Sequence, residues 1–150
     1  MHLTMESQRL AQLALCKLQI LQLLRRLAAQ QLEVITGGDM SNLLKLLAAK
    51  QSVMDQLTKV EQQLDPFRGQ DPETRDWPST AERESCQRNV EACNELLSEI
   101  MRLEKQGEAE MVRRRNDASV RLDGMHGARE ARHAYVAAAA ATGLDLSTEG

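Results

Sequence analysis

Residues 20–47, ILQLLRRLAAQQLEVITGGDMSNLLKLL, contain the end of one leucine-rich segment, a Gly-Gly-Asp turn and the start of a second leucine-rich segment. Apolar residues on both sides of the turn recur every three or four positions, which is the spacing of one face of an α-helix. Gly37 is suited to the left-handed position that ends a helix, and Asp39 can cap the N-terminus of the next helix. This stretch therefore predicts two helices joined by a tight turn.

The same spacing continues in both directions and predicts helices over about residues 4–35 and 39–64. The expected contact row of the first helix comprises Leu10, Leu13, Lys17, Ile20, Leu24, Leu27, Gln31 and Val34. The expected row of the second helix comprises Leu43, Leu47, Lys50, Met54, Leu57, Glu61 and Leu64. The first helix carries more leucines than one neighbour could cover, so it is expected to pack inside a bundle.

A proline-rich connection follows the second helix. Pro66, Pro72 and Pro78 cannot continue a helix, and the only Phe and the only Trp of the chain, Phe67 and Trp77, lie among them. We expect these two aromatic side chains to hold the connection against the bundle. The segment 79–82, STAE, has the spacing of a capping box and predicts the start of a third helix.

The third helix is predicted over about residues 79–123, with a regular heptad pattern that is apolar at its start and mixed later. The pattern comprises Cys86, Val90, Cys93, Leu97, Ile100, Glu104, Gly107, Met111, Arg114, Ala118, Arg121 and Met125. Gly124 and Gly127 are expected bend points, before a weaker helix over 128–141 and a flexible tail over 142–150. The sequence thus predicts an all-α domain over residues 1–141, an antiparallel three-helix bundle or coiled coil with a long third helix and a short C-terminal extension.

Composition excludes several classes of protein. Apolar residues make up 42% of the 150-residue chain but aromatic residues only 2%, which argues against an all-β domain. The net charge of −3 offers no overall basic surface for nucleic acid. Three cysteines without metal-ligand spacing, and an N-terminus without a secretory leader pattern, predict a cytoplasmic protein. No apolar run is long enough to cross a membrane.

The residues that could carry chemistry do not converge on a site. No glycine-rich phosphate loop is present, and we expect neither catalysis nor a cofactor or metal. His126 and His133, one heptad apart, are interpreted as solvated side chains, and Cys86 and Cys93 as small core residues. The basic run 113–115 is flanked by acidic residues and is interpreted as a solvated helix surface.

Apolar side chains remain on the distal part of the third helix, namely Met101, Met111, Leu122 and Met125. They would be bundle core, or they would form a site where an amphipathic partner helix completes the bundle. Methionine suits the second interpretation, because its flexible side chain accepts several apolar partners.

Residues 30–64 resemble the FlgN/FliT-type flagellar export chaperones, which are small all-helical proteins. Members of that family show a glutamate before a Gly-Asp turn, then a leucine pair, a Lys-Gln step and a further leucine. The corresponding residues here are Glu33, Gly38, Asp39, Leu43, Leu44, Lys50, Gln51 and Leu57. The family also has a long third helix and a tyrosine before a glycine-containing tail, which Tyr135 and Gly143 resemble.

The resemblance implies a cytoplasmic chaperone of the flagellar type III secretion system. Such chaperones bind the amphipathic C-terminal helices of flagellar hook-associated (junction) proteins, prevent their premature assembly and deliver them to the export apparatus. On this view, Met111, Ala118, Leu122 and Met125 would contact the cargo, and Tyr135 would dock on the export gate. We expect a monomer or a weak homodimer.

Two alternatives remain at the level of sequence. The chain could be a structural coiled-coil protein that dimerises through its third helix, or a rod-like component of the flagellar export machinery that docks on the ATPase and has no cargo groove. An enzyme is the least favoured class, because no set of titratable groups is predicted to meet in one pocket.

Overall fold

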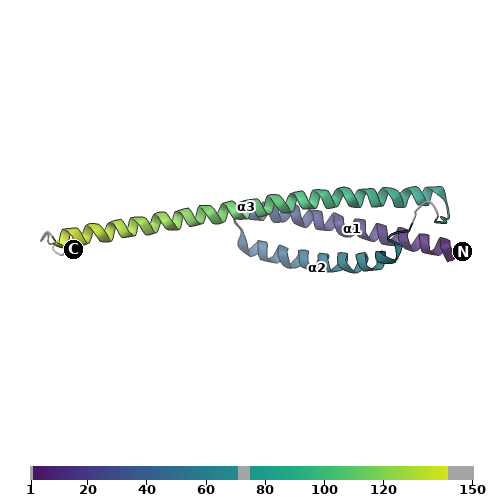
Figure 1. The fold of residues 1–150 in the computed structure, drawn as a ribbon, viewed down its shortest axis with the longest axis horizontal. Helices are drawn as coiled ribbons and strands as arrows, with labels where there is room; N and C mark the ends of the chain where they lie inside the picture. The colour runs from purple at the N-terminus through teal and green to yellow at the C-terminus, as the bar shows by residue number, and fades with distance from the viewer. Residues whose placement is uncertain (1, 71–74, 142–150) are drawn as a thin grey trace. The chain divides into compact units, whose positions relative to one another are not determined.

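The protein is all-α, and three helices pack together in it (Figure 1). A computed structural model describes residues 2–70 and 75–141, with side chains from residue 4 onward. The helices are α1 (His2–Gly37), α2 (Met40–Leu64) and α3 (Thr80–Ala141), and a short 3₁₀ helix, η1 (Asp65–Phe67), follows α2. The described residues contain no strand, so the predicted fold class is confirmed.

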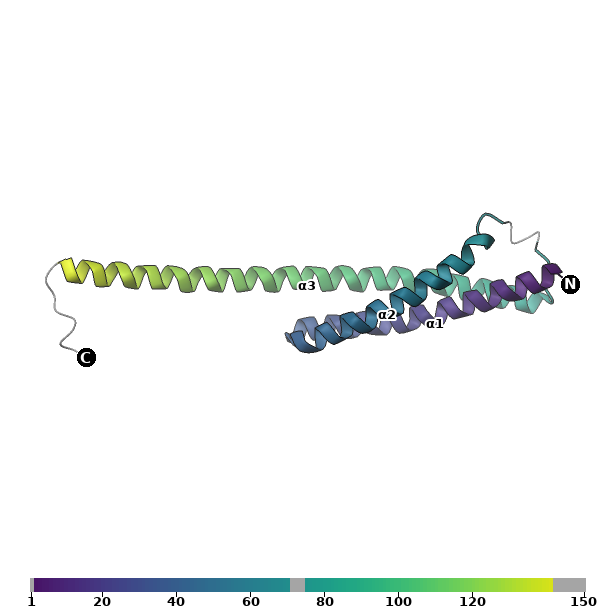
Figure 2. The ribbon, with the colours of Figure 1, turned by 90° about the horizontal axis from the view of Figure 1, so that it is seen from below.

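The chain forms two compact units, Met1–Glu108 and Ala109–Gly150, and α3 contributes to both. In the first unit, α1 lies along the N-terminal part of α3, and α2 runs antiparallel to both (Figures 1 and 2). The second unit consists, in its described part, of the remaining residues of α3. No helix among the described residues combines the length and apolar character that crossing a membrane requires.

The turn between α1 and α2 forms where the sequence predicts it, but with a different glycine in the left-handed position. Gly38, with φ of 76°, adopts that conformation, whereas Gly37 is still part of α1, so the prediction for Gly37 was wrong. The amide of Gly38 donates to the carbonyl of Ile35, and the amide of Asp39 to that of Val34, both at 3.1 Å. These two bonds form a Schellman motif, which satisfies two of the carbonyls in the last turn of α1.

Asp39 caps the N-terminus of α2 as predicted. Its carboxylate accepts a hydrogen bond from the amide of Asn42 at 3.2 Å, within the first turn of the helix. The first turn of α3 is capped in the same way, because the hydroxyl of Ser79 accepts from the amide of Glu82 at 3.1 Å. Both caps satisfy amides that have no partner within their own helix.

The connection between α2 and α3 is held against α1. The buried hydroxyl of Ser7 in α1 donates to the carbonyl of Asp76. The guanidinium of Arg75 lies over the ring of Phe67, 5.2 Å from its centroid, and Phe67 and Trp77 are both half-buried. The predicted role of the two aromatic residues agrees with these positions.

The core of the first unit draws on all three helices. Its central cluster comprises Leu21, Leu24, Val53, Cys93 and Ile100. Among the described residues of α1, five of the seven that are buried recur every seven positions, as in a coiled coil; they are Ser7, Ala14, Leu21, Ala28 and Ile35, and the other two are Leu13 and Leu24. In α3 the corresponding buried positions are Cys86, Cys93, Ile100 and Gly107.

Small residues allow α1 and α3 to approach closely. The sulfur of Cys93 lies 3.9 Å from the carbonyl oxygen of Ala14. Farther along, Ile35 is 1% exposed and packs toward Gly107, where an added Cβ would lie 3.6 Å from the Ile35 Cδ1 atom. The two helices thus alternate large and small side chains across their contact.

Polar residues within the predicted contact rows pair with one another across helices. The ammonium of Lys17 in α1 contacts the carboxylate of Glu61 in α2 at 2.7 Å. Lys50 in α2 donates to Gln31 of α1 at 3.1 Å and forms an ion pair with Glu104 of α3. Because each pair joins different helices, these contacts favour one alignment of the helices along their length.

The predicted contact rows are correct in part. In α2 the buried residues are Leu43, Val53 and Val60, whereas Leu47 and Met54 are exposed. In α1 the contact is centred on Leu21 and its heptad partners, so several predicted positions lie at its edge. Leucines surround α1 and occur throughout α2, so the spacing alone does not fix the buried face.

The third helix is longer than predicted. It continues without interruption through Gly124 and Gly127 to Ala141, so neither glycine ends it and residues 128–141 are not a separate helix. The flanking arginines, alanines and leucine favour helix strongly enough to offset the cost of each glycine, which is about 1 kcal/mol relative to alanine. The predicted tail over 142–150 lies outside the described residues, and so does Gly143.

Candidate functional site

The residues that the sequence analysis assigned to cargo binding lie together on one face of α3. At 3.6 residues per turn, Met111, Ala118, Leu122 and Met125 fall within an arc of about 60° around the helix axis. We call these four residues the α3 apolar row. All of them belong to the second unit, where α3 is the described element.

The side chains of the α3 apolar row are exposed. Leu122 and Met125 are 65% and 64% exposed, in contrast to Leu21 in the core, which is fully buried. Val136 extends the same face towards the end of the helix and is also exposed. The interpretation of these residues as bundle core is therefore wrong for Leu122 and Met125.

Tyr135 does not lie on this face. It is about 120° away from the α3 apolar row around the helix axis, and it is 71% exposed. The predicted cargo residues and the predicted docking residue are thus exposed on different sides of one helix. Val120 is 70% exposed and lies on the side opposite the row.

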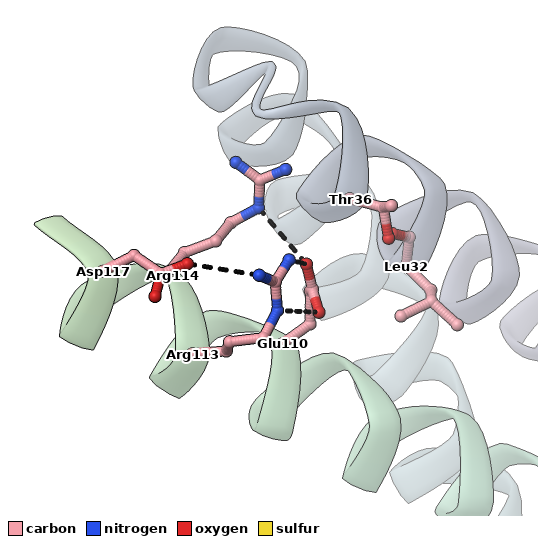
Figure 3. Close-up of polar contacts among 6 residues, drawn as sticks. All are labelled: Leu32, Thr36, Glu110, Arg113, Arg114 and Asp117. Carbon is pink, nitrogen blue, oxygen red and sulfur yellow. Dashed lines mark hydrogen bonds and ion pairs between the residues drawn. The ribbon is translucent and has the colours of Figure 1, made fainter.

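The basic run 113–115 is divided between different sides of the helix. Arg113 points away from the α3 apolar row and contacts two carboxylates, that of Glu110 at 2.5 Å and that of Asp117 at 3.2 Å (Figure 3). Its hydrogen bonds hold the pKa of the Glu110 carboxyl below its usual value. The predicted solvated surface is correct for Arg113, whose charge is neutralised along its own helix.

Arg114 and Arg115 project towards the side of the α3 apolar row. The Nε atom of Arg114 lies 3.5 Å from the Glu110 carboxylate, a longer contact than those of Arg113 (Figure 3). Arg115 forms no ion pair with any other residue that the structure describes. The prediction of one solvated surface for all three arginines missed this division, which helix periodicity alone could have revealed.

The histidines and cysteines occupy the predicted environments. His126 and His133 share one side of α3 and are exposed, and the Nε2 atom of His126 lies 2.9 Å from the Glu130 carboxylate. Among residues 2–70 and 75–141, no three His, Cys, Asp or Glu side chains are grouped to hold a metal ion. Cys86 and Cys93 are buried in the first unit, and burial raises the pKa of both thiols, which keeps them protonated and unreactive.

A small cavity of about 190 Å³ lies beside Cys93 in the first unit. Its lining includes Leu10, Ala14, Phe67 and Val90, with Lys17 at its edge. Lys17 is paired with Glu61 and the thiol of Cys93 is protonated, so neither group is prepared for acid–base or nucleophilic chemistry. We interpret the cavity as a packing gap next to Phe67.

A second exposed apolar row occurs on α2 and was not predicted. Met40, Leu44, Leu47 and Met54 lie within an arc of about 80° on the side of α2 next to its buried face. Leu44 is the most exposed of them, at 69%. The predicted contact row of the second helix included Leu47 and Met54, because leucine spacing alone does not separate the buried apolar face of α2 from this exposed one.

Comparisons of the chain with protein-family models, with curated proteins and with solved structures found no match. No relative therefore adds evidence on function. The exposed faces of the helices are the features from which a function can be inferred.

Proposed function

We propose that this protein is a cytoplasmic export chaperone of the flagellar type III secretion system, which binds amphipathic C-terminal helices of hook-associated (junction) proteins. The observation that carries the proposal is the α3 apolar row, four residues on one exposed face of a long helix. The motif resemblance of residues 30–64 supplies the class of partner. The chaperone would keep the partner unassembled and deliver it to the export apparatus.

The exposed row supports binding on energetic grounds. Covering a leucine or methionine side chain that was in water contributes about 1.5–3 kcal/mol. Leu122 and Met125 lie on adjacent turns of α3 and on the same face, so a partner helix could cover both at once. The apolar stripe of an unassembled amphipathic helix must itself be covered, because an exposed stripe promotes aggregation.

The charge of this face argues against the alternative of a homodimer through α3. Arg115 lies beside the row, and Arg129 continues the line of the row one turn beyond Met125, both on the same side of the helix as Leu122. If two copies paired through this face, arginines of one copy would approach arginines of the other. Such like-charge contacts disfavour a dimer and leave the row available to a different partner.

Tyr135 is proposed as the residue that docks on the export apparatus. It is exposed and lies away from the α3 apolar row, so it would remain accessible while a cargo helix covered that row. A phenol ring offers an apolar surface together with a hydroxyl that can donate a hydrogen bond, a combination common in protein interfaces.

The test compares two sides of the same helix. The double variant Leu122→Ser and Met125→Ser should lose binding to a junction-protein C-terminal fragment, measured by isothermal titration calorimetry. Val120→Ser is the matched control, because Val120 is equally exposed but lies on the opposite side of α3. Circular dichroism checks that both variants retain their helix content.

If Val120→Ser reduced binding as much as the double variant, the proposed face would be wrong. If the double variant bound the fragment as well as the unmodified protein, the cargo-binding role of the row would be refuted.

A further inference from the structure

Arginines are concentrated on the side of α3 that carries the α3 apolar row. Within about 80° of the centre of the row lie five of the six arginines of residues 109–141. We call them the arginine set; its members are Arg114, Arg115, Arg121, Arg129 and Arg132. Arg113, the sixth, lies on the opposite side.

The acidic residues of the same segment lie outside this sector. Glu110 and Asp117 project to one flank, and both contact Arg113 (Figure 3). Asp123 and Glu130 project to the other flank, where Glu130 contacts His126. The carboxylates of this segment are therefore at the margins or the back of the helix, and no carboxylate lies among the apolar side chains of the row.

Most of the arginine set has no ion-pair partner among the residues that the structure describes. Arg115, Arg121, Arg129 and Arg132 are exposed, and none of them forms an ion pair with another described residue. Their charges are available to a molecule that covers the row. A covering molecule without negative charge would lie against several cations without any favourable electrostatic interaction with them.

We propose that the α3 apolar row and the arginine set together recognise an acidic amphipathic helix, one whose apolar stripe is bordered by glutamate or aspartate. This inference rests on the proposed function and specifies the charge of its partner. The apolar stripe would contact Ala118, Leu122 and Met125. The bordering carboxylates would pair with Arg115 on one flank of the row, with Arg121 and Arg132 on the other flank, and with Arg129 just beyond Met125.

Other acidic surfaces match this face less well. A nucleic acid would match the arginines but would leave Leu122 and Met125 against phosphates and water. Helices that insert into the surface of an anionic membrane usually present bulky apolar residues such as Trp, Phe and Leu, and this side of α3 offers one leucine and no aromatic residue. A partner helix needs only a narrow apolar stripe, which the row provides.

The test uses the full chain and three synthetic four-heptad peptides with the same leucine stripe. The residues that border the stripe are glutamate in the first peptide, glutamine in the second and lysine in the third. We expect the glutamate peptide to bind about tenfold more tightly than the glutamine peptide, and the lysine peptide to bind more weakly than either. The preference should shrink as salt is added, because exposed charges are screened.

A charge reversal then locates the preference. The double variant Arg115→Glu and Arg129→Glu should bind the lysine peptide better than the glutamate peptide. Arg88→Glu with Arg102→Glu is the matched control, because both are exposed arginines in the first unit and neither forms an ion pair with a described residue. The control should keep the preference of the unmodified protein.

The outcomes separate this inference from the proposed function. If all three peptides bound equally well and the Leu122→Ser and Met125→Ser variant bound none, the function would stand and the inference about charge would be refuted. If no peptide bound, both would fail. Tighter binding of the chain to phosphatidylglycerol vesicles or to a DNA duplex than to the glutamate peptide would also overturn the inference, in favour of a lipid or a nucleic-acid partner.

Discussion

The replacement Leu21→Ala tests where the core of the first unit lies. Leu21 is fully buried in the cluster that joins α1, α2 and α3. The substitution removes the equivalent of three buried methylene groups, about 2.4 kcal/mol at 0.8 kcal/mol each. The cavity that remains adds to this loss, so the expected decrease in the free energy of unfolding is about 3–4 kcal/mol.

Leu44→Ala is the control, since it makes the same chemical change at a position that is 69% exposed. Alanine and leucine have similar helix propensities, so this variant should change stability by less than about 0.5 kcal/mol. Urea unfolding followed by the fluorescence of Trp77, the only tryptophan, reports on the first unit without interference from the C-terminal residues of α3. A difference between the two variants below about 1 kcal/mol would refute the packing described for α1.

Three further predictions concern single positions. Gly107→Ala should raise the stability of the first unit by about 0.5–1 kcal/mol in the same urea experiment, because the added Cβ has room and alanine favours helix. Cys16 is exposed and should react with Ellman's reagent in the native protein, whereas the buried Cys93 should react only on unfolding. Because burial raises the pKa of Cys93, its contribution to stability is complete below about pH 8.5 and is lost as the pH rises through its folded-state pKa. Glu110, whose pKa is lowered mainly by its hydrogen bonds to Arg113, should stabilise the helix above its unfolded-state pKa and lose this effect as the pH falls through its folded-state pKa. Carbon NMR titration should show that Arg113→Gln raises the pKa of Glu110.

The sequence was sufficient to predict the elements that local chemistry determines. Asp39 and Ser79 cap helices where their spacing indicates, and Pro66 lies just beyond the end of α2 at Leu64. Each of these features depends on a few neighbouring residues. These helix boundaries therefore do not depend on how the helices pack against one another.

The sequence was not sufficient where packing chooses among equivalent residues. Val53 is buried and its neighbour Met54 is exposed, although the spacing of leucines favoured Met54 for the core. A helix with apolar residues on most of its circumference allows several contact faces, and the fit to α1 and α3 selects one of them. The length of α3 was underestimated because glycines weaken a helix without necessarily ending it.

The candidate site was predicted in its apolar part and missed in its charged part. Met111, Leu122 and Met125 were identified from the surplus of apolar residues on α3, and their exposure agrees with a surface that is free to bind. The arginines beside them were considered as a run along the chain, which places Arg113 and Arg115 together. Around the helix these two side chains point in different directions, and only one of them borders the row.

The central claim is that this protein binds a helix from another protein. Size-exclusion chromatography with light scattering, on the chain alone and mixed with a junction-protein C-terminal fragment, tests this claim most directly. We predict a monomer or a weak dimer that converts to a stable complex with the fragment. A stable homodimer that ignores the fragment would contradict the claim and would identify the protein as a coiled-coil scaffold.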